Sequence, residues 1–102
     1  MWNALLVVGM SEMALGHSVA AEAAFNKAYR TPDTGFWPAM CYIFALIEND
    51  KSAQARLVAE KTTADHPDLS VGMFKSIVML SNPDENIIER WMEALSAAGI
   101  QE

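Results

Sequence analysis

The sequence is short of positive charge, and this shortage excludes two classes of partner. Seven Lys and Arg residues stand against thirteen Asp and Glu residues, so the formal net charge is −6 over 102 residues. The basic residues are scattered singly, whereas a nucleic-acid surface needs clusters of them to release counterions. An anionic membrane surface is disfavoured for the same reason. We therefore predict no nucleic-acid partner and no membrane partner.

Cysteine and long apolar runs are also scarce. Cys41 is the single cysteine, so no internal disulfide forms and export to an oxidising compartment is not implied. The apolar run from Phe36 to Ile47 is shorter than a bilayer-spanning helix. Residues 1–10 lack the positive start of a signal peptide. Because 52% of the residues are hydrophobic, the composition predicts a folded protein, which we expect to be cytoplasmic.

The usual signatures of catalysis are missing as well. His17 and His66 fall in predicted turns, without carboxylate or cysteine partners at metal-ligand spacing. Cys41 lies inside the apolar run, where burial raises the pKa of a thiol and suppresses its reactivity. An acidic strip on the last predicted helix is interpreted as a solubilising face, and it consists of Asp84, Glu85, Glu89 and Glu93. We predict no catalytic residue, no metal and no cofactor, and therefore a non-enzymatic protein.

What the sequence does contain is a helix, a tight turn and a second helix over residues 5–32. Small residues occupy the positions where two such helices would cross: Gly9 in the first, Ala21 and Ala28 in the second. Phe25 lies between the two alanines. Close helix packing is the expected use of this spacing.

This segment follows a known 34-residue helical pattern, W-x2-L-G-x2-Y, then A-x3-F, then P. Gly9, Ala21 and Phe25 match the pattern with the right gaps, and Leu5 and Val8 are conservative substitutes. Departures are Glu12, where an aromatic residue is expected, and Pro32, which comes one residue early. The segment resembles a tetratricopeptide repeat. The resemblance implies an all-α fold, an α-solenoid of three antiparallel helical hairpins, with repeats at about 1–34, 35–68 and 69–102, and a role as a protein-binding scaffold.

Six helices are predicted from the apolar periodicity and the turn residues between the periodic segments. Their ranges are about 2–15, 19–29, 34–47, a fourth from Asp50 or Ser52 to Ala64, 70–80 and 84–98. The predicted N-caps are Ser18, Thr34, Asp50 or Ser52, and Asn82, the last with Pro83 and Glu85 in a capping box. Gly99 is predicted to terminate the last helix in a left-handed conformation.

The end of the chain carries a second resemblance. It resembles the closing segment of repeat arrays in bacterial proteins that join such repeats to nucleotide-cyclase or transcription-regulator domains. The matching residues are Pro67, Ser70, Val71, Phe74, Arg90, Leu95, Gly99 and Glu102. No cyclase or DNA-binding domain fits beside three repeats in 102 residues, so no activity is transferred.

The resemblance also implies that the first helices of successive repeats line a concave surface. At steps of one repeat length, a stripe of these helices reads Asn3, Leu6, Met10, Met13; Trp37, Met40, Phe44, Ile47; and Val71, Phe74, Val78, Ser81. One interpretation is a trough that holds an apolar peptide or helix through Leu6, Met10, Met13, Trp37, Met40, Phe44, Ile47 and Phe74. The other is that the stripe is core, filled by the chain's own ends. We expect Trp37, Met40, Phe44 and Phe74 to be the anchors of a bound partner.

The first predicted helix is apolar on every side, which indicates burial on every side. Trp2, Leu5 and Val8 are predicted to mediate self-association. The partner would be a second copy packed about a two-fold axis, or further repeats preceding these. The alternative function is therefore a self-associating regulatory or assembly module, detached from a larger signalling protein.

Overall fold

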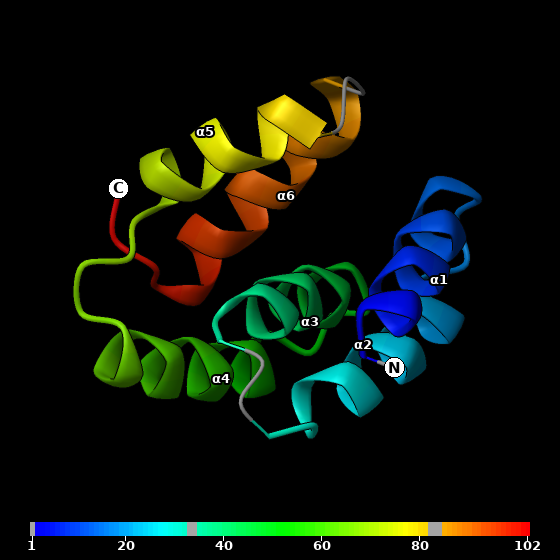
Figure 1. Cartoon of the computed structure of the whole chain (residues 1–102), viewed down its shortest axis with the longest axis horizontal. Coiled ribbons are helices and arrows are strands. Elements are labelled where there is room, and N and C mark those ends of the chain that lie inside the picture. Colours follow the sequence, from blue (N-terminus) through cyan, green and yellow to red (C-terminus); the bar gives the residue numbers. More distant parts are fainter. Residues whose placement is uncertain (1, 33–34, 82–84) are drawn as a thin grey trace.

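A computed structural model of the chain describes residues 2–32, 35–81 and 85–102. These residues form six α-helices and no strand, as Figure 1 shows. The helices are α1 (Trp2–Ala14), α2 (Ser18–Tyr29), α3 (Trp37–Glu48), α4 (Ser52–Asp65), α5 (Val71–Ser81) and α6 (Glu85–Ala98). The prediction of an all-helical chain with six helices is confirmed. None of the described helices is long and apolar enough to cross a membrane.

Most helix bounds agree with the predicted ranges within a few positions, but the predicted N-caps need correction. The N-cap positions of α2 and α4 are His17 and Lys51, and neither makes a side-chain capping hydrogen bond. Ser18 is instead the first residue of α2, where its hydroxyl donates to Asn49 Oδ1 at 2.6 Å. Thr34, Asn82 and Pro83 lie outside the described residues.

Three helices end in the same type of turn. Gly16, Asp50 and Gly99 have positive φ angles of 81°, 59° and 106°. In each case the next residue's N–H donates to the carbonyl five positions back, the bond that defines a Schellman motif. The predicted role of Gly99 is confirmed, whereas Asp50 ends α3 rather than capping α4. Gly16 and Asp50 are one repeat length apart in the sequence, so the turns after α1 and α3 are equivalent.

The first two helices cross closely at a glycine. A Cβ atom on Gly9 would lie 2.3 Å from Phe25 Cε1, which no real contact allows. Ala21, Phe25 and Ala28 are all fully buried. The predicted crossing of α1 and α2 at small residues is therefore what the structure has.

The helix α3 lies at the centre of the molecule, in contact with α1, α2, α4 and α6 (Figure 1). Where the first hairpin (α1 and α2) meets the second (α3 and α4), the first helix of the second hairpin, α3, packs against α2. The third hairpin (α5 and α6) docks the other way round, because its second helix, α6, rather than its first, packs along α3 and α4. The predicted apolar face of α6 supplies the reason: Ile87, Ile88, Trp91, Met92 and Leu95 are all buried.

The chain's last residues hold α5 in place. The amide N–H groups of Val71 and Gly72 donate to the carbonyls of Gln101 and Glu102. Ser70 Oγ accepts a further bond from the Met73 amide at 3.1 Å. The free amide groups at the start of α5 are thereby satisfied from two sides.

Candidate interaction surfaces

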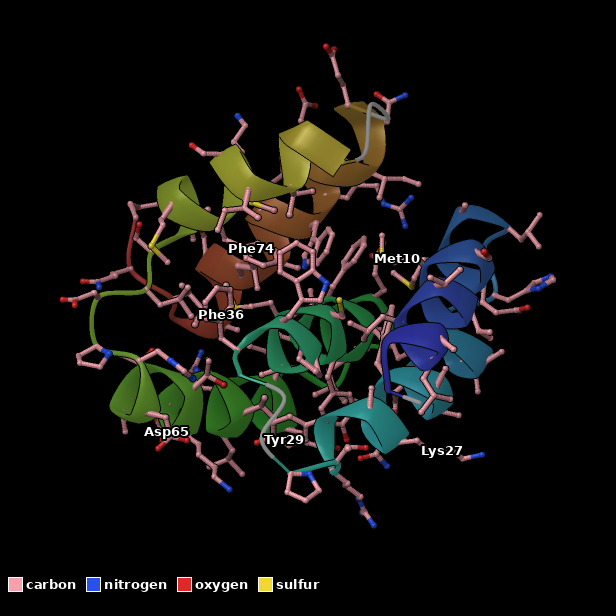
Figure 2. The ribbon with its side chains drawn as sticks, in the orientation of Figure 1. Met10, Lys27, Tyr29, Phe36, Asp65 and Phe74 are labelled. Atoms are coloured by element: carbon pink, nitrogen blue, oxygen red, sulfur yellow. The ribbon has the colours of Figure 1, made fainter. Side chains whose placement is uncertain are left out.

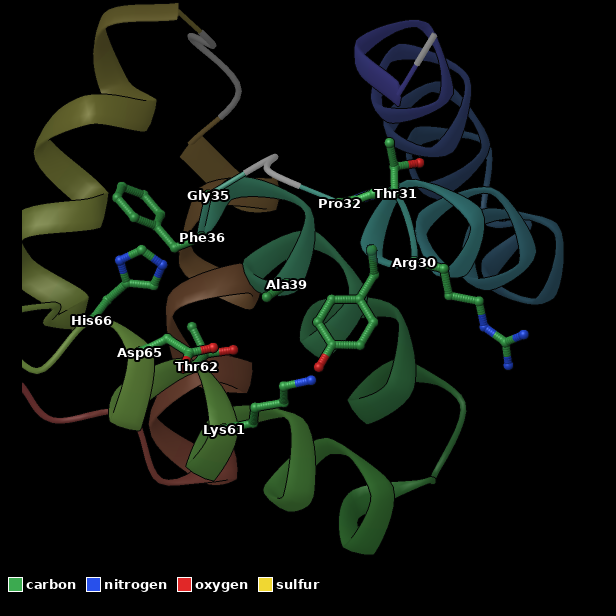
Figure 3. Close-up of a pocket in the computed structure, with 11 residues that line it drawn as sticks. Arg30, Thr31, Pro32, Gly35, Phe36, Ala39, Lys61, Thr62, Asp65 and His66 are labelled. Atoms are coloured by element: carbon green, nitrogen blue, oxygen red, sulfur yellow. The ribbon is translucent and has the colours of Figure 1, made fainter.

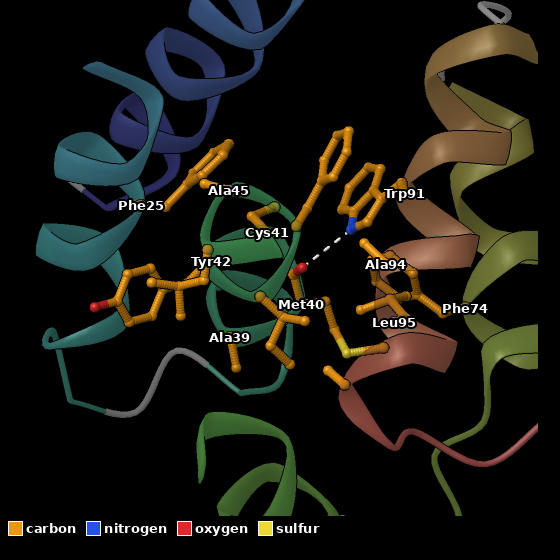
Figure 4. Packing of buried hydrophobic residues seen from close by; sticks show 14 of the residues in the cluster. Phe25, Ala39, Met40, Cys41, Tyr42, Ala45, Phe74, Trp91, Ala94 and Leu95 are labelled. Atoms are coloured by element: carbon orange, nitrogen blue, oxygen red, sulfur yellow. Dashed lines mark hydrogen bonds between the residues drawn. The ribbon is translucent and has the colours of Figure 1, made fainter. Parts of the chain in front are cut away.

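The predicted concave trough is corrected by the structure, because α6 fills it. Trp91 donates its indole N–H to the Met40 carbonyl at 3.0 Å, the dashed line in Figure 4. Its ring stacks on Phe44 with centroids 5.6 Å apart. Phe74 meets the same indole in a T-shaped arrangement, with ring centroids 5.1 Å apart. Met40, Phe44 and Phe74 are therefore 0% exposed. The stripe is core at this point, as the second interpretation of the sequence has it.

The other predicted trough residues divide between core and rim. Leu6 and Met13 are buried, so no partner reaches them in this structure. Met10, Trp37 and Ile47 are half-buried and pack against the core. Met10 lies on the inner side of α1, facing the middle of the molecule (Figure 2). Only these three of the eight predicted residues retain surface that a partner can touch.

Arg90 covers the edge of the aromatic cluster. Its guanidinium pairs with Glu48 of α3 and lies 5.9 Å from the centroid of the Phe44 ring. An arginine over an aromatic face gains cation–π attraction in addition to the ion pair. Sequence reasoning marked Arg90 as part of a family resemblance but did not assign it this contact, since its partners are far away along the chain.

An uncovered apolar stripe runs along α1 on the side away from the core. We call it the outer face of α1, and it consists of Ala4, Val7, Val8 and Ser11 of the helix together with Leu15, the residue directly after it. These positions follow helical spacing, and all five residues are exposed. Val7, Val8 and Leu15 are 68%, 52% and 68% exposed, which is unusual for large aliphatic side chains on one stripe.

The same stripe of α3 is covered. Moving each position of the outer face of α1 forward by one repeat length gives Pro38, Cys41, Tyr42, Ala45 and Asn49, of which the first four are buried. The covering element is α2: Tyr29 packs against Tyr42 with ring centroids 5.3 Å apart. Asn49 donates to the Ser18 carbonyl at 3.0 Å and to Glu22 at 2.9 Å. The outer face of α1 thus corresponds to a face that accepts a helix elsewhere in the molecule.

One of the three residues predicted to mediate self-association lies on the outer face of α1. Val8 belongs to it, whereas Leu5 is half-buried and packs against the core. The side chain of Trp2 lies outside the described residues. Val7 and Leu15 contribute to the all-round apolar character of the first predicted helix, but they are not among the residues predicted to mediate self-association. Comparing them with Cys41 and Asn49, one repeat length later, marks them as members of the same face.

The outer face of α1 is nearly free of charge. Between residues 2 and 21 the sequence has one acidic residue, Glu12, and one residue that can carry positive charge, His17. The Nδ1 atom of His17 lies 2.9 Å from Glu12 Oε2. The other twelve of the thirteen acidic residues lie beyond residue 21. Because the whole chain carries −6, this end of the molecule differs in electrostatic character from the remainder.

A polar pocket of about 560 Å³ lies between the ends of α2 and α4 (Figure 3). Tyr29, Lys61, Asp65 and His66 are among the polar residues that line it. His66 packs edge-on against Phe36 with ring centroids 5.5 Å apart. Among the described residues no three His, Cys, Asp or Glu side chains gather as metal ligands. The absence of metal, cofactor and catalytic residues stays a prediction.

Cys41 is buried in α3, and burial raises the pKa of its thiol far above the ordinary value. A protonated, enclosed thiol is a poor nucleophile. Tyr42, its neighbour, also has a raised pKa, through burial first and the nearby Glu22 carboxylate second. Neither group has the environment of a catalytic residue.

Comparisons with protein-family models, with curated proteins and with solved structures find no match to this chain. The tetratricopeptide resemblance therefore rests on the residues alone and stays a prediction.

Proposed function

We propose that the chain is a non-enzymatic protein–protein interaction module that takes the apolar side of a partner helix on the outer face of α1. One observation carries the proposal. The equivalent face of α3, one repeat length later, is buried against α2, whereas Val7, Val8 and Leu15 of the outer face remain largely exposed. An exposed stripe of this kind marks a contact surface more often than a bare monomer surface.

The proposal includes a tetratricopeptide-like stacking of three hairpins. Support comes from the equivalent turns at Gly16 and Asp50 and from the starts of α2 and α4 at Ser18 and Ser52, each pair one repeat length apart. The reversed docking of the third hairpin is a departure from a regular stack. The departure leaves the first two hairpins, which position the outer face of α1, unaffected.

Binding of an apolar peptide in the concave trough was the leading prediction from the sequence. It is less well supported, because a peptide at Phe44 would have to displace Trp91 and the ion pair between Arg90 and Glu48. Trp91 and Phe44 belong to the folded core, and the ion pair lies at its exposed edge. The outer face of α1 requires no such rearrangement.

A titration with a neutral helix tests the proposal. The probe is a synthetic peptide with one leucine face and one glutamine face, followed by the chemical shifts of the isotopically labelled chain. Without charge on the probe, the acidic surface gives no electrostatic attraction. We expect saturable shift changes centred on Val7, Val8 and Leu15.

Two leucines of similar exposure provide the matched control. Leu15 is 68% exposed on the outer face, and Leu57 is 65% exposed on α4. Leu15→Asp should remove the shift changes, whereas Leu57→Asp should leave them unchanged. Saturable changes centred on α4 or α5, or none at all, would contradict the proposal.

A further inference from the structure

We infer that the helix received by the outer face of α1 is α1 of a second copy of this chain, packed about a two-fold axis. The inference rests on the proposed function and names its partner. Three properties of the face support it: its lack of charge, the order of large and small side chains along it, and its area.

Charge disfavours the acidic faces of the molecule as contacts between two copies and permits the outer face of α1. Copies with a net charge of −6 repel wherever their acidic surfaces meet. On α6, for example, Glu85, Glu89 and Glu93 are exposed at intervals of four positions, so α6 facing α6 would oppose like charges. The outer face of α1 has Glu12 alone near it, beside His17. Two copies that meet through α1 therefore oppose little like charge, and among the other helices α5 also has no acidic residue.

The side chains along the face differ in size, and some of them can pair large with small in an antiparallel arrangement. The large residues are Val7, Val8 and Leu15, and the small ones are Ala4 and Ser11. Consider an antiparallel pair of α1 helices whose two-fold axis passes between Val8 and Ser11. In this register, the residue numbers of two side chains that face each other add up to 19. Val8 of one copy then meets Ser11 of the other, Leu15 meets Ala4, and Val7 meets Glu12. Large opposes small in the first two of these contacts, which suits the self-complementary packing of an isologous pair.

The area of the face sets the strength of the association. The helix α1, with its 13 residues, spans about 20 Å. One helix face of this length is smaller than the roughly 800 Å² per partner of stable complexes. The dimer is therefore weak and reversible, with monomer and dimer in exchange at micromolar to millimolar concentrations.

Sedimentation equilibrium tests the second copy directly. The mass should rise with concentration from the monomer value of 11.2 kDa toward twice that value, and stop there. Val8→Asp places two carboxylates near the axis and should shift the dissociation constant more than tenfold. Leu57→Asp should leave it unchanged. A chain that stays monomeric at millimolar concentration overturns the inference, and so does a mass that grows beyond the dimer, which indicates head-to-tail stacking.

Cross-linking tests the register. A mixture of the Val8→Cys and Ser11→Cys variants is oxidised with glutathione disulfide, while Cys41 stays inert because it is buried. The covalent heterodimer should form much faster than in a mixture of Leu57→Cys and Ser11→Cys. Equal rates in the two mixtures would overturn the antiparallel register. A monomeric chain that still binds the leucine–glutamine helix on α1 contradicts the second copy alone, whereas loss of both contradicts the proposed function too.

Discussion

α1 and α3 are built from similar residues and end in equivalent turns, yet their surroundings differ. In α3 every residue from Pro38 to Leu46 is buried, because α2, α4 and α6 surround it. In α1 the side toward α2 is closed at Gly9, while the outer face lies open. A helix that is apolar on all sides thus indicates how many neighbours it needs, and not whether the same chain supplies them.

The largest expected effect concerns α6, the helix that covers α3 through Trp91. Trp91→Ala should cost about 3–5 kcal/mol of the free energy of unfolding, because it removes a fully packed indole and its hydrogen bond to Met40. Trp91→Phe keeps a ring and should cost about 1–2 kcal/mol. Urea denaturation measures both. Equal losses would mean that the indole does not fill the space between α3 and α5.

The second prediction tests the comparison at equivalent positions. Tyr42→Ala should cost about 2–4 kcal/mol, since Tyr42 is enclosed by α2 and also accepts a hydrogen bond from Gln54. Val8→Ala, at the equivalent position of α1, should change stability by about 0.5 kcal/mol or less. The measurement is thermal unfolding at a concentration well below the dissociation constant of the proposed dimer. If both variants lost stability equally, α1 would be enclosed like α3.

The third prediction concerns the closed side of α1. Gly9→Ala should destabilise the fold by about 1–2 kcal/mol, because the clash with Phe25 outweighs the better helix propensity of alanine. Gly72→Ala is the control, since its Cβ would meet the Glu102 carbonyl at an ordinary 3.4 Å. We expect that control to be neutral or slightly stabilising. Differential scanning calorimetry of the two variants measures the change. If Gly9→Ala left the stability unchanged, the close crossing of α1 and α2 would be refuted.

The smallest expected effect is a pH dependence of the stability that comes from Cys41, which is buried in α3. Burial holds the pKa of Cys41 above its ordinary value of 9.0, so above pH 9 the unfolded chain releases a proton that the folded chain retains. The thiol's contribution to stability is complete below pH 9 and is lost as the pH rises. Between pH 8 and pH 10 this loss amounts to about 1 kcal/mol.

Cys41→Ala supplies the reference for that measurement. Denaturation curves at pH 8 and pH 10 should differ less in this variant than in the wild type. The raised pKa of Tyr42 acts in the same direction and remains in both proteins. Identical pH dependence in the two would show that Cys41 is accessible to water when folded.

The helices were predictable because their signals are local. Apolar periodicity, the glycines at 16 and 99 and the prolines near helix starts lie within a few residues of the bounds that they determine. The N-caps were less predictable, because the Ser18 hydroxyl can bond either to the first turn of its own helix or to a distant residue. In the structure it donates to Asn49, 31 positions away. Part of the candidate surface was also predictable: Val8 was named, and the all-round apolar character of the first helix indicated a missing neighbour.

The sequence by itself determined six helices, the close crossing at Gly9 and an unusually apolar first helix, because each depends on neighbours along the chain. Only the tertiary structure decided that the concave stripe is core. Both α5 and α6 carry apolar faces, and nothing local states which of them meets α3. The choice came from Trp91, whose indole reaches Met40 across 51 positions of sequence and fills the space that Phe44 and Phe74 leave. Packing of that kind is settled by the shapes of side chains brought together in three dimensions, which a one-dimensional pattern does not contain.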